Sequence, residues 1–143
     1  MMKKKPYFLF LFASLLLLLI GFVKSEETFD INVHDTYFII LQNHLYWLFT
    51  LLLFFFFIIY LTLDKIRLHL LKMLTKIHIY GTLLLTVGIF FPYDLLFTSS
   101  NFLLVDDSQS TNVYRSFCVL FFLIAQVLFI INIFVAIIKK LRN

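Results

Sequence analysis

The sequence has few of the residues that build most catalytic and metal sites. Its 143 residues include three Gly, two Pro and one Cys, and charged residues make up 14% of the chain. The single cysteine, Cys118, excludes an internal disulfide and a cluster of thiolate ligands. No glycine-rich phosphate loop, Cys-x-x-Cys, His-Glu-x-x-His or Ser/His/Asp arrangement is found in the sequence. These absences favour a protein that is not an enzyme.

Apolar residues dominate instead. They make up 62% of the sequence, which has 20 Phe residues and a mean hydropathy of +0.99. These values lie far outside the range of soluble proteins and indicate an integral membrane protein, with the lipid bilayer as a partner. The formal net charge is +4, but the cations gather at the ends of apolar segments. The charge therefore reports membrane topology, and no nucleic-acid partner is expected.

Four apolar segments approach or exceed the length of a membrane span: residues 6–23, 37–63, 77–97 and 116–138. Each is too long and too uniformly apolar for a barrel strand, so helices are expected. The sequence predicts an all-α membrane protein with one membrane domain, residues 1–143, built as a bundle of four transmembrane helices. Two interpretations of residues 6–23 stay open, a signal anchor that spans the membrane or a cleaved signal peptide.

The cations are divided unequally between the two sides of this bundle. Lys24 and Arg115 fall on one side. The other ten of the 12 Lys and Arg residues fall on the opposite side: Lys3, Lys4, Lys5, Lys65, Arg67, Lys72, Lys76, Lys139, Lys140 and Arg142. By the positive-inside rule the richer side is cytoplasmic, so both termini are expected there. The expected location is the bacterial inner membrane, which the chain crosses several times.

Small and polar residues in the last two spans are typical of helix contacts in membranes. Four small residues predict a close approach of the third span to a neighbour: Gly81, Thr82, Thr86 and Gly88. Gln126 and Asn132 in the fourth span predict interhelical hydrogen bonds worth on the order of 1 kcal/mol each. Between the second and third spans, residues 64–76 form an amphipathic segment that is expected on the membrane surface.

His44 is the most unusual residue of the second span. It is predicted about seven residues into the span, so roughly 10 Å below its outer end at helical rise. An imidazole in an apolar site suits a haem iron or another transition metal. The alternative is a hydrogen bond to a neighbouring helix through Gln126, and the periodicity of the sequence favours this alternative. Gln42 and Asn43 have the same two interpretations, with interhelical hydrogen bonding favoured.

Three other histidines lie near the ends of the spans. His34 and Asp35 form a hydrated pair that could contribute to a divalent-metal site, although two ligands cannot complete one. The alternative is a helix start, in which Asp35 or Thr36 caps free backbone amides. His69 and His78 are expected on the cytoplasmic side, in surface or interface positions.

Three ordered motifs resemble the carboxyl-terminal part of subunit I of the haem–copper oxidases. H-D-T-Y-F at residues 34–38, followed by His44, is similar to the signature H-D-T-Y-(Y/F)-V-V-A-H-F-H of that family. K-I-H at residues 76–78 and F-F-P at residues 90–92 follow in the order of the family. The resemblance covers nearly the whole chain and the last four helices of a much larger subunit. It implies that H-D-T-Y lies outside, in agreement with the cation distribution.

The resemblance also implies site residues. It makes His44 the axial ligand of a low-spin haem and places His34 and Asp35 at the family's magnesium site. Gln42 stands where the family has the histidine that ligates the high-spin haem. The paired arginines that hold haem propionates are replaced by leucines at residues 103–104 in an ungapped alignment. The helices that carry the copper ligands have no counterpart here, so oxygen reduction by this chain alone is not expected.

Three hypotheses about function follow. The first is a non-catalytic membrane protein that resembles part of the oxidase subunit and acts by helix contacts, with respiratory-complex subunits or a second copy of itself as partners. The second is a haem-binding electron-transfer or oxidase-associated subunit with His44 as axial ligand. The third is a transporter or channel subunit, which the apolar run at residues 54–59 disfavours.

Overall fold

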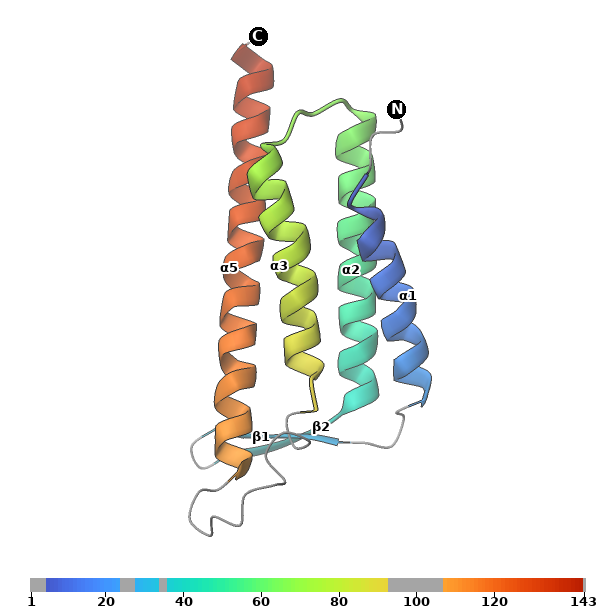
Figure 1. Ribbon diagram of the computed structural model, residues 1–143, viewed down its shortest axis with the longest axis vertical. Helices are drawn as coiled ribbons and strands as arrows, with labels where there is room; N and C mark the ends of the chain where they lie inside the picture. Colours follow the sequence, from blue (N-terminus) through green and yellow to red (C-terminus); the bar gives the residue numbers. More distant parts are fainter. Residues whose placement is uncertain (1–4, 24–27, 34–35, 93–106, 143) are drawn as a thin grey trace. The chain divides into compact units, whose positions relative to one another are not determined.

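The computed structural model describes residues 5–23, 28–33, 36–92 and 107–142 (Figure 1). This part of the chain folds into helices and one β-hairpin. In chain order they are α1 (Phe8–Val23), β1 (Thr28–Val33), β2 (Thr36–Leu41), α2 (Gln42–Lys65), α3 (Lys72–Phe90) and α5 (Asp107–Arg142). The chain divides into two compact units. The first is Met1–His69 with Ala136–Asn143, and the second is Leu70–Val135.

Three of the described helices are long and apolar enough to cross a membrane: α2, α3 and the part of α5 at Val113–Arg142. This confirms a largely helical chain with the character of an integral membrane protein. Helix α1 has 16 residues, so its length is about 24 Å against about 30 Å of hydrocarbon in a bilayer. It is therefore shorter than the span predicted at residues 6–23.

Helix α2 begins later than the span predicted at residues 37–63. Residues of that span up to Leu41 belong to β2, which pairs antiparallel with β1 from Thr28↔Leu41 to Val33↔Thr36. The segment is rich in β-branched and aromatic residues, which favour a pleated strand over a helix. Gln42, the first residue of α2, connects this helix to β1, since its side-chain Nε2 donates to the backbone oxygen of Thr28 at 3.3 Å.

The other helices also differ from the predicted spans at their ends. Helix α3 begins at Lys72 and ends at Phe90, whereas residues 77–97 were predicted. Its early end has a clear cause, because the residue before a proline is driven out of the helical region. Phe91, which precedes Pro92, is extended at φ −64° and ψ 132°. The predicted surface segment at residues 64–76 is thus divided among the end of α2, the connection at residues 66–71 and the first turns of α3.

In the first unit, α1 and α2 pack along a seam with alternating spacings of three and four residues. On α1 the buried side is formed by Phe10, Ser14, Leu17 and Gly21. This spacing keeps one stripe of a helix against its neighbour. Phe10 is fully buried, with its ring centroid 5.7 Å from that of Phe56 on α2. Gly21 lies against Tyr46, at the other end of α2, so the two helices are antiparallel.

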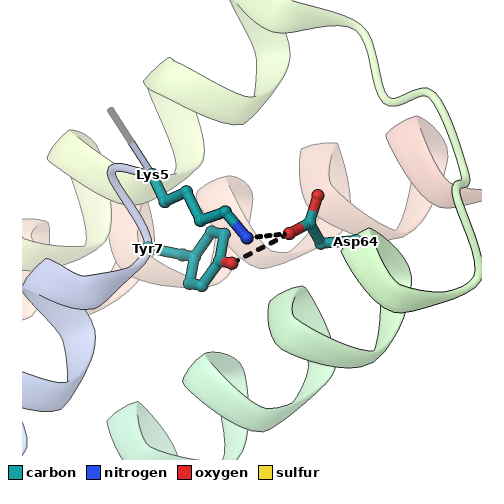
Figure 2. A network of polar contacts seen from close by, with 3 residues as sticks. All are labelled: Lys5, Tyr7 and Asp64. Atoms are coloured by element: carbon teal, nitrogen blue, oxygen red, sulfur yellow. Dashed lines mark hydrogen bonds and ion pairs between the residues drawn. The ribbon is translucent and has the colours of Figure 1, made fainter. Parts of the chain in front are cut away.

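A polar contact closes this pair at one end (Figure 2). Lys5 Nζ lies 2.6 Å from Asp64 Oδ2, and Tyr7 Oη donates to the same oxygen at 3.1 Å. The hydrogen bond to Asp64 raises the pKa of the Lys5 ammonium above its ordinary value, so the pair stays charged at neutral pH and weakens as pH rises through that pKa. Lys140 Nζ donates to the backbone oxygen of Ile66 at 3.2 Å. Lys5 and Lys140, from two segments far apart in the sequence, therefore lie at the same end of this unit.

The carboxyl end of α2 is closed by three backbone hydrogen bonds. Ile66 N donates to Thr62 O, Arg67 N to Asp64 O, and Leu68 N to Leu63 O, at 2.9, 3.1 and 3.0 Å. Arg67 has a φ of 55°. This is the Schellman-type ending, in which the left-handed position is usually glycine. A side chain in this conformation costs about 1–2 kcal/mol.

We expect Gly21→Ala to destabilise the α1–α2 pair by about 1 kcal/mol, the lower end of the range for overpacking. The added Cβ would lie 3.0 Å from Tyr46 Cβ and 3.1 Å from Trp47 Cδ1. Trp47 is the single tryptophan of the chain, so thermal unfolding in detergent can be followed by its fluorescence.

Gly81→Ala is the matched control. No heavy atom of the described residues lies within 4 Å of a Cβ built on Gly81, so the close approach predicted for this one residue is not found. This variant should unfold at or above the temperature of the natural protein, because alanine favours the helix. Equal unfolding temperatures of Gly21→Ala and Gly81→Ala would contradict the close packing of Gly21 against α2.

Candidate functional site

The second unit contains the main group of buried polar side chains among the described residues. On α5 its inner seam is formed by Phe122, Ala125, Phe129 and Asn132, again three and four residues apart. On α3 the buried positions are His78, Ile79, Thr82, Thr86 and Ile89. Three of these five are polar, so the interface between α3 and α5 mixes hydrocarbon with hydrogen-bonding groups.

Gln126 of α5 is the centre of this interface. Its Nε2 donates to Thr82 Oγ1 at 3.2 Å and to the backbone oxygen of Phe122 at 3.1 Å. These bonds orient the amide so that Oε1 faces His78 Nε2 at 2.8 Å. Because an amide oxygen can only accept, Nε2 of His78 carries the proton and donates.

His78 is held on a second side by an aromatic ring. Its imidazole stacks on Phe129 with centroids 4.2 Å apart and planes 9° apart, and its side chain is 0% exposed. Thr86 continues the polar stripe along α3, since its Oγ1 donates to Thr82 O at 2.7 Å. The imidazole therefore serves as a bridge between α3 and α5.

Asn132 makes a second bridge, at the beginning of α3. Its Oδ1 accepts from Leu71 N at 2.9 Å, and its Nδ2 donates to Thr75 Oγ1 at 3.1 Å. Leu71 is the N-cap residue of α3 and makes no side-chain cap. Asn132 thus supplies from α5 a partner for the backbone at the start of α3, a function usually served by a local Ser, Thr, Asp or Asn.

The structure confirms that Gln126 and Asn132 form interhelical hydrogen bonds. The partner suggested for Gln126 was wrong, because it bonds to His78 and not to His44. His78 occupies an interface, one of the two positions expected for it, but it is buried and not at the surface. A signal for its role was present in the sequence, since His78, Thr82 and Thr86 recur every four residues and so share one helix face.

His44 lies in the first turn of α2, as its third residue, and its side chain is exposed. It is therefore only about 3 Å along the helix from its beginning, against the 10 Å predicted. The cause is the conversion of residues 36–41 into β2. The edge of its imidazole faces Trp47, with centroids 6.0 Å apart.

His34 and Asp35 lie outside the described residues, as do the leucines at residues 103–104. Among the residues that are described, no group of three or more His, Cys, Asp or Glu side chains could hold a metal ion. Two polar atoms of α2, Asn43 Oδ1 and Thr50 Oγ1, are shielded and have no hydrogen-bond partner in this same part of the chain.

Comparison with known proteins adds no relative: no family model matches the chain, and no curated protein or solved structure matches it either. The similarity to the oxidase subunit therefore stays a prediction that rests on the motifs.

Gln126→Leu should destabilise the α3–α5 pair by about 1–2 kcal/mol, the upper part of the range for hydrogen bonds between membrane helices. The substitution removes the acceptor of His78 and a donor to Thr82, both of which are fully buried. The measurement is unfolding in mixed micelles at increasing denaturing detergent.

Thr86→Val is the matched control, because its hydroxyl bonds to Thr82 O within the same helix. It should change stability by a few tenths of a kcal/mol at most. A loss of stability as large as that of Gln126→Leu would mean that the interhelical hydrogen bonds of Gln126 contribute no more than a hydrogen bond within one helix.

Proposed function

We propose that the chain is a non-catalytic integral membrane protein that acts through contacts of its helices with other membrane proteins. The partners proposed are subunits of a haem-bearing respiratory complex, because of the similarity to oxidase subunit I, or a second copy of the chain. The observation that carries the proposal is the pair of shielded, unpartnered oxygens on α2, Asn43 Oδ1 and Thr50 Oγ1.

These two residues are seven positions apart, so they lie on nearly the same face of α2, two turns from each other. A polar atom without a partner is unfavourable in hydrocarbon. Because both oxygens are shielded within the chain, each side chain would have to rotate outward to meet a neighbouring helix. That helix would need one hydroxyl or amide group at the height of each oxygen. By contrast, Thr62 of the same helix already donates to Ile58 O at 2.9 Å.

We further propose that α1 is retained as a fourth span and that both termini are cytoplasmic, in the inner membrane of a bacterium. Two features support this. The packing of Phe10 and Tyr7 along α2 gives α1 a place in the folded protein. The gathering of cations at one end of the first unit suits the positive-inside rule.

The test is affinity purification of the full chain from cross-linked membranes in mild detergent. We expect a respiratory-complex subunit or a second copy to be recovered, and expect recovery to fall several-fold in Thr50→Val, since one interhelical hydrogen bond is worth about 1 kcal/mol. Thr62→Val, the same substitution on the same helix, should leave recovery unchanged. Recovery of the monomer alone would refute the proposal.

A second candidate is a haem-binding electron-transfer subunit. The observation that favours it is the exposed imidazole of His44 beside three exposed apolar side chains of the same helix, Trp47, Leu48 and Leu51. Such a surface could hold one face of a haem, with His44 of a second copy on the other face.

This candidate predicts a Soret band in protein purified from haem-replete cells. The band should disappear in His44→Ala and persist in His69→Ala, because His69 is an exposed histidine beyond the opposite end of α2. A colourless preparation would exclude it.

A further inference from the structure

The turn that follows α2 holds an arginine in a conformation that glycine would adopt at lower free energy. Arg67 has a φ of 55°, and the backbone around it is fixed by the hydrogen bond from Leu68 N to Leu63 O. Leu63 and Leu68 occupy the positions where an apolar pair usually accompanies this ending, and both are 8% exposed. The backbone of the turn is thus fixed by hydrogen bonds, and the side chain of Arg67 is exposed.

A second cation is fixed next to Arg67. Lys140 Nζ donates to the backbone oxygen of Ile66 at 3.2 Å, one residue before Arg67. An ammonium has three donors, so this bond leaves capacity for an anion. Both residues belong to the first unit, and both are exposed.

The charge of these cations is not balanced within the described part of the chain. Asp64 is the sole carboxylate whose side chain is described there, and it is occupied by Lys5 and Tyr7 (Figure 2). Neither Arg67 nor Lys140 forms an ion pair with a described residue. Among the side chains that the structure describes, these two neighbouring cations therefore have no counter-charge.

We infer that this turn binds the phosphodiester headgroup of an anionic phospholipid, with Arg67 as a bidentate donor and Lys140 as a second donor. A planar guanidinium matches two phosphate oxygens. The site lies at the end of a helix long enough to cross a bilayer, where anionic headgroups are concentrated. Ile66, which is 49% exposed, offers an apolar surface beside the cations for the first part of an acyl chain. A lipid accounts for both kinds of contact, whereas free phosphate would use the cations alone.

The test is native mass spectrometry of the full chain released from nanodiscs that contain equal amounts of phosphatidylglycerol and phosphatidylcholine. We expect phosphatidylglycerol to be retained preferentially. Arg67→Gly and Lys140→Gln should each reduce its retention roughly fivefold, the effect expected for one basic residue at an anionic surface. Retention of phosphatidylglycerol by Arg67→Lys should fall between that of Arg67→Gly and that of the natural protein. Lysine keeps the positive charge but lacks the planar guanidinium that can donate to two phosphate oxygens.

Two controls separate this site from general attraction of cations to an anionic membrane. Lys139→Gln and Arg142→Gln remove charges from the same end of α5 and should keep most of the phosphatidylglycerol. Arg67→Gly should also unfold at or above the temperature of the natural protein, since glycine relieves the backbone. Loss of lipid in a protein that is at least as stable would exclude misfolding as the cause.

Three results would overturn the inference. They are equal retention of the two lipids, equal losses in all four charge-neutralising variants, and full displacement of phosphatidylglycerol by millimolar inorganic phosphate. Displacement by inorganic phosphate would mean that the turn binds a free anion and not a lipid headgroup.

Discussion

Apolar side chains give helices in a bilayer little reason to prefer one another over lipid, so polar contacts decide which surfaces meet. In the second unit this constraint falls on the hydrogen bond between His78 and Gln126. His78 is fully buried and Gln126 is partly buried, so losing this hydrogen bond is costly in the interior of the helix pair. Asn132 adds a second fixed point near the start of α3. Two such points set both the register and the rotation of α3 against α5, and the apolar seam packs within those limits.

The first unit is organised differently. Its interior is a seam of aromatic and small side chains, in which Phe10 fills space and Gly21 allows close approach. Its ion pair lies at one end, where Lys5 meets Asp64 and both are about half exposed. Contacts of this kind are worth little in free energy, but they mark the end of the unit that carries the cations. One chain thus combines hydrogen bonds inside one helix pair with close packing inside another.

Hydropathy was sufficient to locate α2, α3 and the apolar part of α5, because length and composition alone decide whether a helix can cross a bilayer. It could not place the beginning of α2. Residues 36–41 are apolar enough for a span, and their β-branched and aromatic residues also suit a strand, so the outcome depends on pairing with β1. The same limit applied to the site. The polar character of Gln126 was evident, but the choice of His78 over His44 depends on which helix lies beside α5.

The β-hairpin has a consequence for how the protein sits in a membrane. The outer edges of a two-stranded sheet carry backbone groups that the sheet does not pair, and these are not tolerated in hydrocarbon. Since β2 continues directly into α2 at Gln42, the hairpin prevents this helix from sliding inward, and Arg67 resists movement the other way. Helix α2 has 24 residues, so it is about 36 Å long against about 30 Å of hydrocarbon. Anchored at both ends, it meets a thinner bilayer by tilting.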